Sequence, residues 1–399
     1  MPAGAAGPLM TDIVRPPPHH GGLIRSLVLQ GALVLIVGVL AGGAIYNAAQ
    51  NLAHANIAHG FGFRNNTAGF DISQSLISYS ASTSTFGRAF WVGLLNTLLV
   101  AGLGIFFATI LGFVVGLARL SRNWLVERLA TGYVELIRNI PLLLQILFWY
   151  NAVLKSLPEM RGSVALPFGG YLNNRGLFLP RPEFGERFDA VIIALIVGVI
   201  VAAGLHIRAR RVQERTGTQV GTLWPTLGAV IGLPLVTLTI FHFPLSFHNP
   251  DLGRFNVRGG LEILPELAAL VIALSTYTAA FIAEVVRAGV LSVSPGQVEA
   301  AQALGLRSGT TLRLIVVPQA MRVIVPPLTN QYLNLTKNSS LAVAIGYPDL
   351  VQVFAGSVLN ITGQAVEVIA ITMAVYLSIS LVTSLLMNLY GRTVAIAER

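Results

Sequence analysis

Long, mostly uncharged apolar segments alternate with short charged connections along most of the chain. An α-helix rises 1.5 Å per residue, so about 20 apolar residues cross the roughly 30 Å hydrocarbon core of a bilayer. We predict that each such segment is a membrane-spanning helix, at residues 26–46, 89–118, 129–154, 190–206, 223–243, 264–286, 320–345 and 367–390. The pattern therefore predicts an all-α integral membrane protein with about eight transmembrane helices.

The connections between these segments divide the chain further. Residues 1–25 are rich in Pro and Gly, which is typical of a disordered tail. Residues 47–88 and 155–187 are polar or Pro/Gly-rich, and we expect both to lie on the periplasmic side. Residues 391–399 are predicted to form a short C-terminal tail.

The distribution of basic residues indicates how the spans are oriented, because cytoplasmic loops carry an excess of Lys and Arg. With eight spans, the basic clusters after the second, fourth, sixth and eighth spans share one side, and both termini lie in the cytoplasm. One loop opposes this arrangement, because it places five basic residues outside: Lys155, Arg161, Arg175, Arg181 and Arg187. The alternative is six spans, with the fourth and fifth segments on the membrane surface. We prefer eight, because moving one loop would place a second basic cluster outside: Arg208, Arg210, Arg211 and Arg215.

Composition excludes several classes of protein. The chain is 54% hydrophobic and only 11% charged, whereas a soluble domain carries about a quarter charged residues. The net charge of +9 fits basic loops that face an anionic membrane leaflet, so we expect no nucleic-acid partner. There is no Cys, and the seven His are scattered without H-E-x-x-H spacing. We therefore expect no metal site and no catalytic centre in this chain.

The connection between the sixth and seventh spans has the strongest local signals in the sequence. Ser294 and Gln297 have the spacing of a capping box at the start of a short helix. Gly305 is predicted to end this helix, since a left-handed position is cheap only without a β-carbon. Ser308 is predicted to cap a second short helix, which Pro318 ends or kinks.

This connection, residues 294–318, resembles the E-A-A loop of ABC-importer permeases. The pattern is E-A-A, three residues, a glycine, nine residues, and then I-x-x-P. Every fixed position is filled here, by Glu299, Ala300, Ala301, Gly305, Ile315 and Pro318. The resemblance implies that these residues couple the chain to a separate ATPase subunit, whose groove receives the first helix.

The resemblance extends over residues 89–390. The second, third, sixth, seventh and eighth spans resemble the five-helix core of type I ABC importers. The first span is then an N-terminal addition, and residues 188–243 are an inserted helical hairpin. The stretches E-L-I-R-N-I-P-L-L-L-Q from Glu135 and L-T-K-N-S-S-L from Leu335 resemble the polar-amino-acid branch, and N-N-R-G-L from Asn173 resembles the larger permease subunit of general L-amino-acid importers.

This resemblance implies a permease subunit that moves L-amino acids across the bacterial inner membrane. Its implied partners are an ABC ATPase, a second homologous but distinct permease, and a periplasmic amino-acid-binding protein. The chain lacks G-x-x-x-x-G-K-[ST], so we expect no cofactor here, with ATP bound by the partner subunit. The alternative is an ion-coupled secondary amino-acid transporter, which predicts an inverted repeat that the sequence does not clearly contain.

The seventh predicted span carries the candidate translocation path. Asn330, Asn334 and Lys337 have spacings of four and three residues, which places them on one helix face, with Asn338 on its flank. Polar groups at membrane depth usually face the bundle interior or a water-filled cavity. We hypothesise that this face contacts the amino acid during passage. The alternative is hydrogen bonding between helices, worth about 0.6–2 kcal/mol per contact.

Two further charged pairs have helical spacing. Glu135 and Arg138 are three residues apart, as are Glu284 and Arg287. We interpret both as possible structural ion pairs near the cytoplasmic ends of their spans. Pro141 is predicted to kink the third span.

Overall fold

The computed structural model describes residues 20–54, 60–218, 221–253 and 257–394. The predicted N-terminal tail, residues 1–25, therefore lies outside the described residues up to residue 19. The C-terminal tail, predicted at residues 391–399, is described as far as residue 394.

The predominantly helical membrane fold is confirmed. Within the described residues, six helices are long and apolar enough to cross a membrane: Phe86–Ala118, Phe188–Gln213, Leu223–Ile240, Pro265–Leu291, Ser308–Ile345 and Ala365–Thr393. A seventh crossing is formed if the bent pair Trp124–Asn139 and Leu142–Leu154 counts as one span. Each of these seven helices or helix pairs overlaps one predicted segment.

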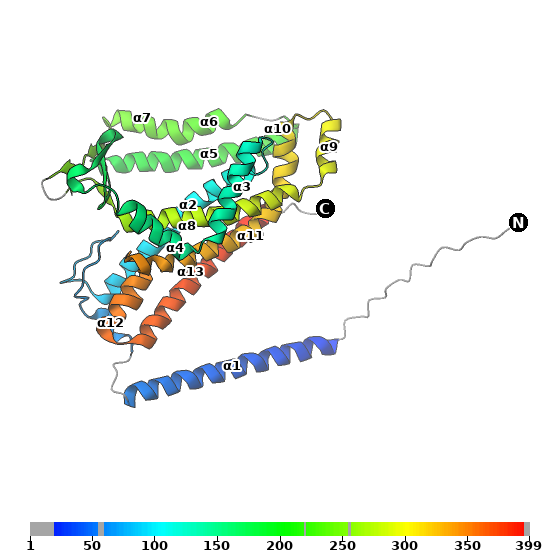
Figure 1. Ribbon diagram of the computed structural model, residues 1–399. Helices are drawn as coiled ribbons and strands as arrows, with labels where there is room; N and C mark the ends of the chain where they lie inside the picture. The colour runs from blue at the N-terminus through cyan, green and yellow to red at the C-terminus, as the bar shows by residue number, and fades with distance from the viewer. Residues whose placement is uncertain (1–19, 55–59, 219–220, 254–256, 395–399) are drawn as a thin grey trace.

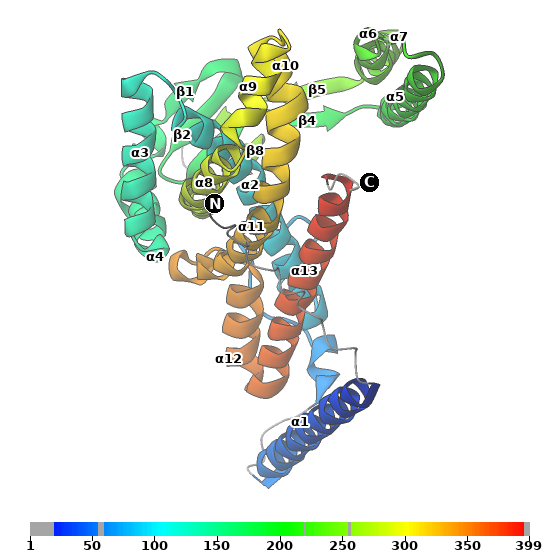
Figure 2. The same ribbon diagram turned by 90° about the vertical axis from the view of Figure 1, so that its right-hand side faces the viewer.

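Helix α1 (His20–His54) overlaps the first predicted segment, and it lies apart from the bundle in both views (Figures 1 and 2). It begins before and ends after the predicted span at residues 26–46. Its side chains between Leu27 and Leu40 are largely exposed and apolar, which suits contact with lipid. Helix α1 begins on the side of the molecule that carries α9 (Figure 1).

The core is built on a close pair of helices, α2 (Phe86–Ala118) and α8 (Pro265–Leu291), which run in the same direction. Three α2 glycines face neighbouring helices. A β-carbon on Gly112 would lie 2.6 Å from Cβ of Ile282, and one on Gly116 would lie 2.8 Å from Cβ of Val286. A β-carbon on Gly104 would instead meet Leu335. Small residues thus let the helix backbones approach closely, which is how helices associate in lipid.

We expect Gly112→Ala to destabilise the bundle, because its methyl group would overlap the Ile282 side chain. Overpacking a tight core typically costs about 1–3 kcal/mol. Thermal unfolding of the detergent-solubilised chain should therefore show a lower Tm. The matched control is Gly102→Ala on the same helix, where an added β-carbon meets nothing within 4 Å. Equal Tm values for the two variants would contradict close α2–α8 packing.

The third predicted span is broken rather than gently kinked. Helices α3 (Trp124–Asn139) and α4 (Leu142–Leu147, continued by a π-helical segment to Leu154) are bent by 104°. The break lies at Ile140, which is extended because the following Pro141 disfavours a helical conformation. Gln145 Nε2 donates to the carbonyl oxygens of Ile137 and Ile140, both at 2.9 Å, and so satisfies two acceptors near the break.

The predicted outer loop contains strands that the all-α prediction missed. Four short antiparallel strands form one sheet in the order β1 (Val164–Leu166), β2 (Gly170–Asn173), β3 (Gly176–Leu179) and β8 (Leu261–Ile263). Two further pairs join β4 (Arg181–Phe184) to β5 (Leu245–His248), and β6 (Asp251–Leu252) to β7 (Val257–Arg258). Since α8 begins directly after β8, these strands mark the end of the bundle opposite the E-A-A loop. We call it the strand end, and the other the loop end.

The inserted hairpin grows out of the β4–β5 pair. Its first arm is α5 (Phe188–Thr216), and its second consists of α6 (Leu223–Leu227), a π-helical turn and α7 (Leu233–Ile240). The two arms touch where Gly198 lies against the carbonyl of Ala229. Figure 2 shows the hairpin standing away from the other helices at the end of β4 and β5. Its outer surface is apolar and exposed within this chain, as expected of helices that contact lipid.

The chain after α8 forms the loop end and then returns. The loop carries α9 (Pro295–Ala303) and α10 (Ser308–Thr311), and α10 continues through a π-helical turn into α11 (Val317–Asn338). A 3₁₀ segment and a π-helical segment lead to α12 (Leu359–Thr362), and α13 (Ala365–Val394) closes the bundle against α11. In Figure 1, α13 ends on the side that carries α9.

Candidate functional site

The corner of the E-A-A loop is a complete Schellman motif. Gly305 has a positive φ of 73° and donates its N–H to the carbonyl of Gln302 at 2.9 Å. Leu306 donates to the carbonyl of Ala301 at 3.1 Å. Nothing lies within 4 Å of a β-carbon added at Gly305, so backbone conformation alone requires glycine here. The local sequence thus sets the direction in which the chain leaves α9.

We expect Gly305→Ala to destabilise the loop, because alanine in the left-handed region costs roughly 1–2 kcal/mol. Limited proteolysis of the detergent-solubilised chain should therefore cleave residues 294–318 faster than in the unaltered chain. The matched control is Gly296→Ala in the first turn of α9. This position has an ordinary φ, and its nearest neighbour is Ser294 Oγ at 3.8 Å. An equal rate of cleavage in the two variants would contradict the requirement for glycine at the corner.

Two sequence predictions about this loop are wrong. Ser294 precedes α9, but its side chain makes no capping hydrogen bond. Gln297 does not reach back to complete a capping box, and its Oε1 instead accepts from Gln319 Nε2 at 2.8 Å. The contact joins α9 to the start of α11, so this glutamine stabilises the loop through tertiary structure.

The second correction concerns Ser308, which is the first residue of α10 rather than its cap, since Arg307 holds the cap position and no side chain caps the helix. Pro318 does not end its helix. The turn before it, Leu312–Val316, is π-helical, and α11 runs on from Val317 with Pro318 in its first turn. A proline clashes with the carbonyl four residues earlier in a regular helix, and a wider turn provides the room. Residues 308–345 consequently form one long helical segment.

The exposed face of α9 combines charge with apolar surface. Glu299 and Ala300 are exposed, whereas Ala301 is buried. Leu304 at the corner is 80% exposed, which makes it one of the most exposed leucines of the described chain. The sequence analysis missed Leu304, although its place beside the predicted corner glycine was the available signal. Ile315 and Pro318 are half-buried and support the loop from the start of α11.

A basic hollow of about 630 Å³ lies on the second half of the loop. It is lined by Arg307, Gly309, Thr310, Arg313 and Leu314. The two arginines and the exposed Leu314 give this surface the mixed basic and apolar character that suits contact with another protein.

The four candidate path residues lie on α11 as the spacing predicts. Asn330, Asn334 and Lys337 are exposed within this chain, and Asn338 is half-buried. Of the four, Lys337 lines a cavity with a volume of about 410 Å³, whose walls do not include the three asparagines. Its other walls come largely from α13: Ser340, Val351, Thr372, Met373, Tyr376, Leu377 and Ser380. The structure thus brings Lys337 close to hydroxyl groups of α13. Asn330 and Asn334 lie on α11 outside the walls of this cavity.

A buried polar cluster adjoins this cavity at Tyr376, and the sequence alone did not predict it. Asn96 Nδ2 donates to the carbonyls of Gln74 and Pro348, both at 2.9 Å. Thr97 Oγ1 accepts from the backbone N–H of Leu350 at 3.0 Å. Asp349 accepts from the N–H of Gln352 at 2.8 Å and lies 3.3 Å from the Tyr376 hydroxyl. These bonds attach the start of α2 to the turn after α11 and position Tyr376 on the cavity wall.

The charged residues singled out on the third and sixth spans are placed differently from one another. Glu284 contacts Arg287 at 3.5 Å, together with Arg119 and Arg138. Among the described residues, no salt bridge joins Glu135 to Arg138, because Arg138 points to α8 instead. Separations of 165 and 146 residues along the chain hid both new partners from a local reading of the sequence.

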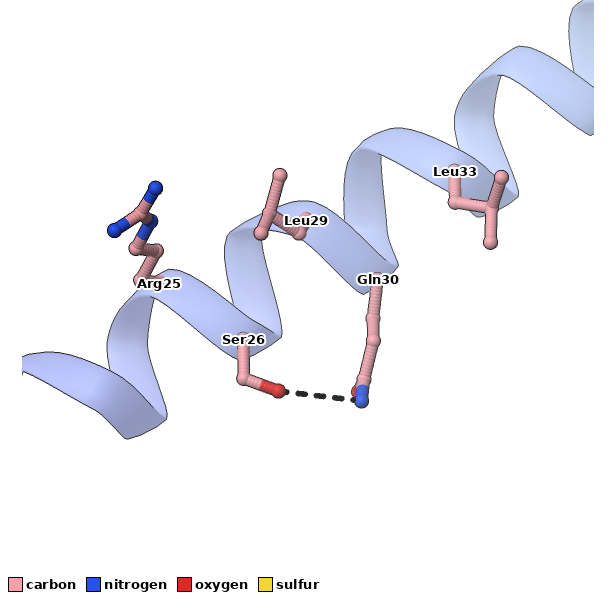
Figure 3. A pocket seen from close by; sticks show the side chains of 5 residues that line it. All are labelled: Arg25, Ser26, Leu29, Gln30 and Leu33. Carbon is pink, nitrogen blue, oxygen red and sulfur yellow. Dashed lines mark hydrogen bonds between the residues drawn. The ribbon is translucent and has the colours of Figure 1, made fainter. Parts of the chain in front are cut away.

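A further hollow of about 360 Å³ lies along α1, lined by Arg25, Ser26, Leu29, Gln30 and Leu33. Figure 3 shows that these side chains come from a single helix, where Gln30 donates to the Ser26 hydroxyl at 3.4 Å. The described residues provide no opposite wall, so this groove forms no enclosed site.

The sequence is similar to a family of membrane transport proteins and to several of its known members. Residues 104–396 match the family described as "Binding-protein-dependent transport system inner membrane component". The putative amino-acid ABC transporter permease protein YhdX of Escherichia coli is 53% identical over 92% of this chain and 93% of its own length. The general L-amino acid transport system permease protein AapQ of Rhizobium johnstonii is 52% identical over 94% and 93%.

Two other similarities are more distant. The glutamate/glutamine/aspartate/asparagine transport system permease protein BztB of Rhodobacter capsulatus is 42% identical over 94% of this chain and 95% of its own length. Among solved structures, an amino acid ABC transporter with histidines is 21% identical, with a TM-score of 0.46, over 77% of this chain and 95% of that chain. The family match and the long, highly similar relatives agree, and the chain belongs to the family of inner-membrane components of binding-protein-dependent transport systems.

Proposed function

We propose that the chain is the permease subunit of an ATP-driven importer of L-amino acids. The observation that carries this proposal is the E-A-A loop, whose glycine corner presents an exposed Glu299 and Leu304 at one end of a membrane bundle. The curated relatives that share more than nine-tenths of the chain are described as amino-acid permeases, which supports the substrate class.

In this mechanism the chain performs no ATP chemistry itself. ATP binding closes the partner ATPase subunits, and α9 moves with the groove that holds it. Because α9 follows directly from α8 and is bonded to α11 through Gln297 and Gln319, its motion reaches both helices. The bundle thereby alternates between two arrangements that open to opposite sides, which is a coupled conformational change.

The proposed passage runs beside α11. An amino acid carries a carboxylate, and the Lys337 ammonium on the cavity wall offers it a charge-assisted hydrogen bond. Hydroxyl groups of Thr372, Tyr376 and Ser380 line the same cavity and can bond the polar ends of the substrate. Asn330, Asn334 and Asn338 extend the polar face along the helix, so the solute passes between polar groups rather than through lipid.

The complete transporter requires other subunits. Two ATPases need two docking loops, and this chain has one, so we propose a heterodimer with a second, homologous permease. A periplasmic binding protein delivers the amino acid at the strand end. The loop end and both termini then lie in the cytoplasm of a bacterium, with the bundle in its inner membrane.

The proposal is tested by reconstituting the purified complex in liposomes. We expect uptake of a labelled L-amino-acid mixture only when ATP is present at the loop end and the binding protein at the strand end. An imposed proton or sodium gradient without ATP should drive none. Uptake driven by the gradient alone would overturn the proposal in favour of an ion-coupled secondary transporter.

A further inference from the structure

One carboxylate near the loop end is shared by arginines from three helices. Glu284 on α8 accepts from Arg119, directly after α2, through a short hydrogen bond. Its oxygens lie 3.6 Å from Arg138 Nη1 of α3 and 3.5 Å from Arg287 Nη1 of its own helix. A carboxylate has two oxygens with about four acceptor positions, so it can serve all three guanidinium groups.

The burial of Arg119 makes this arrangement costly to break. Its side chain is only 10% exposed, and its Nε has no hydrogen-bond partner among the described residues. Removing the single negative charge would leave a buried guanidinium uncompensated, which strongly disfavours the arrangement. Glu284 therefore adds an ion pair at the end of α2 to the close packing of Gly116 against Val286.

The same residue positions α3. The Arg138 guanidinium lies 5.0 Å from the centre of the Phe281 ring, one turn before Glu284, and is thus held by two groups of α8. Tyr133 donates its hydroxyl to the carbonyl of Thr276 at 2.6 Å, and Val134 packs against small side chains of α8. These contacts lie entirely on the loop side of the break at Ile140 and Pro141.

The far side of the break is attached to α8 separately. The Tyr150 hydroxyl donates to Glu266 at 2.7 Å, close to the start of α8 at the strand end. The broken span is thus attached to α8 on both sides of a bend of 104°. Of these attachments, the Glu284 cluster lies within a few turns of the coupling loop.

We propose that Glu284 is a positioning residue of the coupling mechanism, which makes α2, α3 and the last turns of α8 move with α9 as one body. This inference rests on the proposed function as an ATP-coupled permease. This role explains why one carboxylate is surrounded by three guanidinium groups. The arginines come from the end of α2, from α3 and from α8, so the shared carboxylate links these three segments.

The first test is the Glu284→Gln variant in the complete reconstituted complex. We expect assembly and basal ATP hydrolysis to persist, while stimulation of hydrolysis by the loaded binding protein and uptake each fall about tenfold. The matched control is Glu135→Gln, which removes an exposed carboxylate of α3 that forms no salt bridge in the described residues. The control should show the same stimulation of ATP hydrolysis and the same uptake as the unaltered chain.

A charge exchange separates positioning from general loss of structure. Glu284→Arg places four arginines together and should abolish stimulation. Combining it with Arg138→Glu restores one acid among three bases, and we expect most of the stimulation to return. If the double variant shows no more stimulation of ATP hydrolysis than Glu284→Arg alone, the proposed role of Glu284 is wrong.

Distance measurements test the same inference without removing the carboxylate. The chain contains no cysteine, so spin labels at Leu136→Cys on α3 and Leu291→Cys on α8 would be unique. We expect their separation to stay constant between nucleotide-free and ATP-bound complexes, and to broaden with Glu284→Gln. A change of several ångströms in the otherwise unaltered chain would contradict movement as one body. If the unaltered complex shows no ATP-driven uptake, the proposed function fails instead.

Discussion

Leu304→Asp should separate the chain from its ATPase partner. Leu304 is 80% exposed at the corner that follows α9, although burial of a leucine side chain is worth about 1.5–3 kcal/mol. Such an apolar tip becomes favourable when a groove of another protein receives it. An aspartate there would desolvate a charge in the same groove, so we expect at least about 2 kcal/mol of lost binding, roughly a 30-fold weaker complex.

The measurement is co-purification from mild detergent followed by an ATPase assay of the eluate. The matched control is Leu261→Asp, an exposed leucine on β8 at the strand end. Its complex should purify intact. Glu299→Arg, which reverses an exposed charge of α9, should lose the ATPase as Leu304→Asp does. Intact complexes with both loop variants would mean that another surface of the chain receives the ATPase.

Lys337→Met should strongly reduce amino-acid uptake while leaving the complex assembled. Lys337 is the one candidate path residue on the cavity wall, and no carboxylate of the described residues lies within 4.0 Å to form a salt bridge with it. Its ammonium is thus available to the carboxylate of the passing substrate. Hydrogen bonds to charged groups are worth about 1.5–3 kcal/mol, so we expect uptake to fall roughly 10- to 100-fold.

Two variants control for this effect. Lys337→Arg keeps the charge and should retain most of the uptake. Asn330→Ala, about two helical turns away and off the cavity wall, should have a much smaller effect than Lys337→Met. Basal ATP hydrolysis should be the same in all three complexes. Normal uptake by Lys337→Met would remove this cavity from the translocation path and leave the polar face of α11 as a packing surface.

Local signals predicted the parts of the fold that depend on neighbouring residues. Hydropathy located the spanning helices, because the length needed to cross a bilayer is a property of each segment alone. Gly305 was correctly predicted to turn the chain, since its left-handed φ of 73° follows from the residue type. The inserted hairpin was found for the same reason, and its arms lie at the predicted residues.

Features that depend on distant contacts were not predictable in this way. Two strands of the outer loop pair across the inserted hairpin, β3 with β8 and β4 with β5, and all of the strands are too short for a periodic pattern. The spacing paired Gln297 with Ser294 in a local capping box, whereas in the structure it contacts Gln319, which is distant in the sequence. Glu284 was assigned to Arg287 by spacing, whereas its closest partner, Arg119, comes from another helix.

The pairing of β4 with β5 has a consequence for the path of the chain through the membrane. Arg181 lies opposite His248, so the chain leaves the bundle and re-enters it at adjacent positions. The two arms between them add either two crossings or none, and an even number preserves the parity of the path through the membrane. A hairpin inserted at this point therefore leaves the direction of every later helix unchanged.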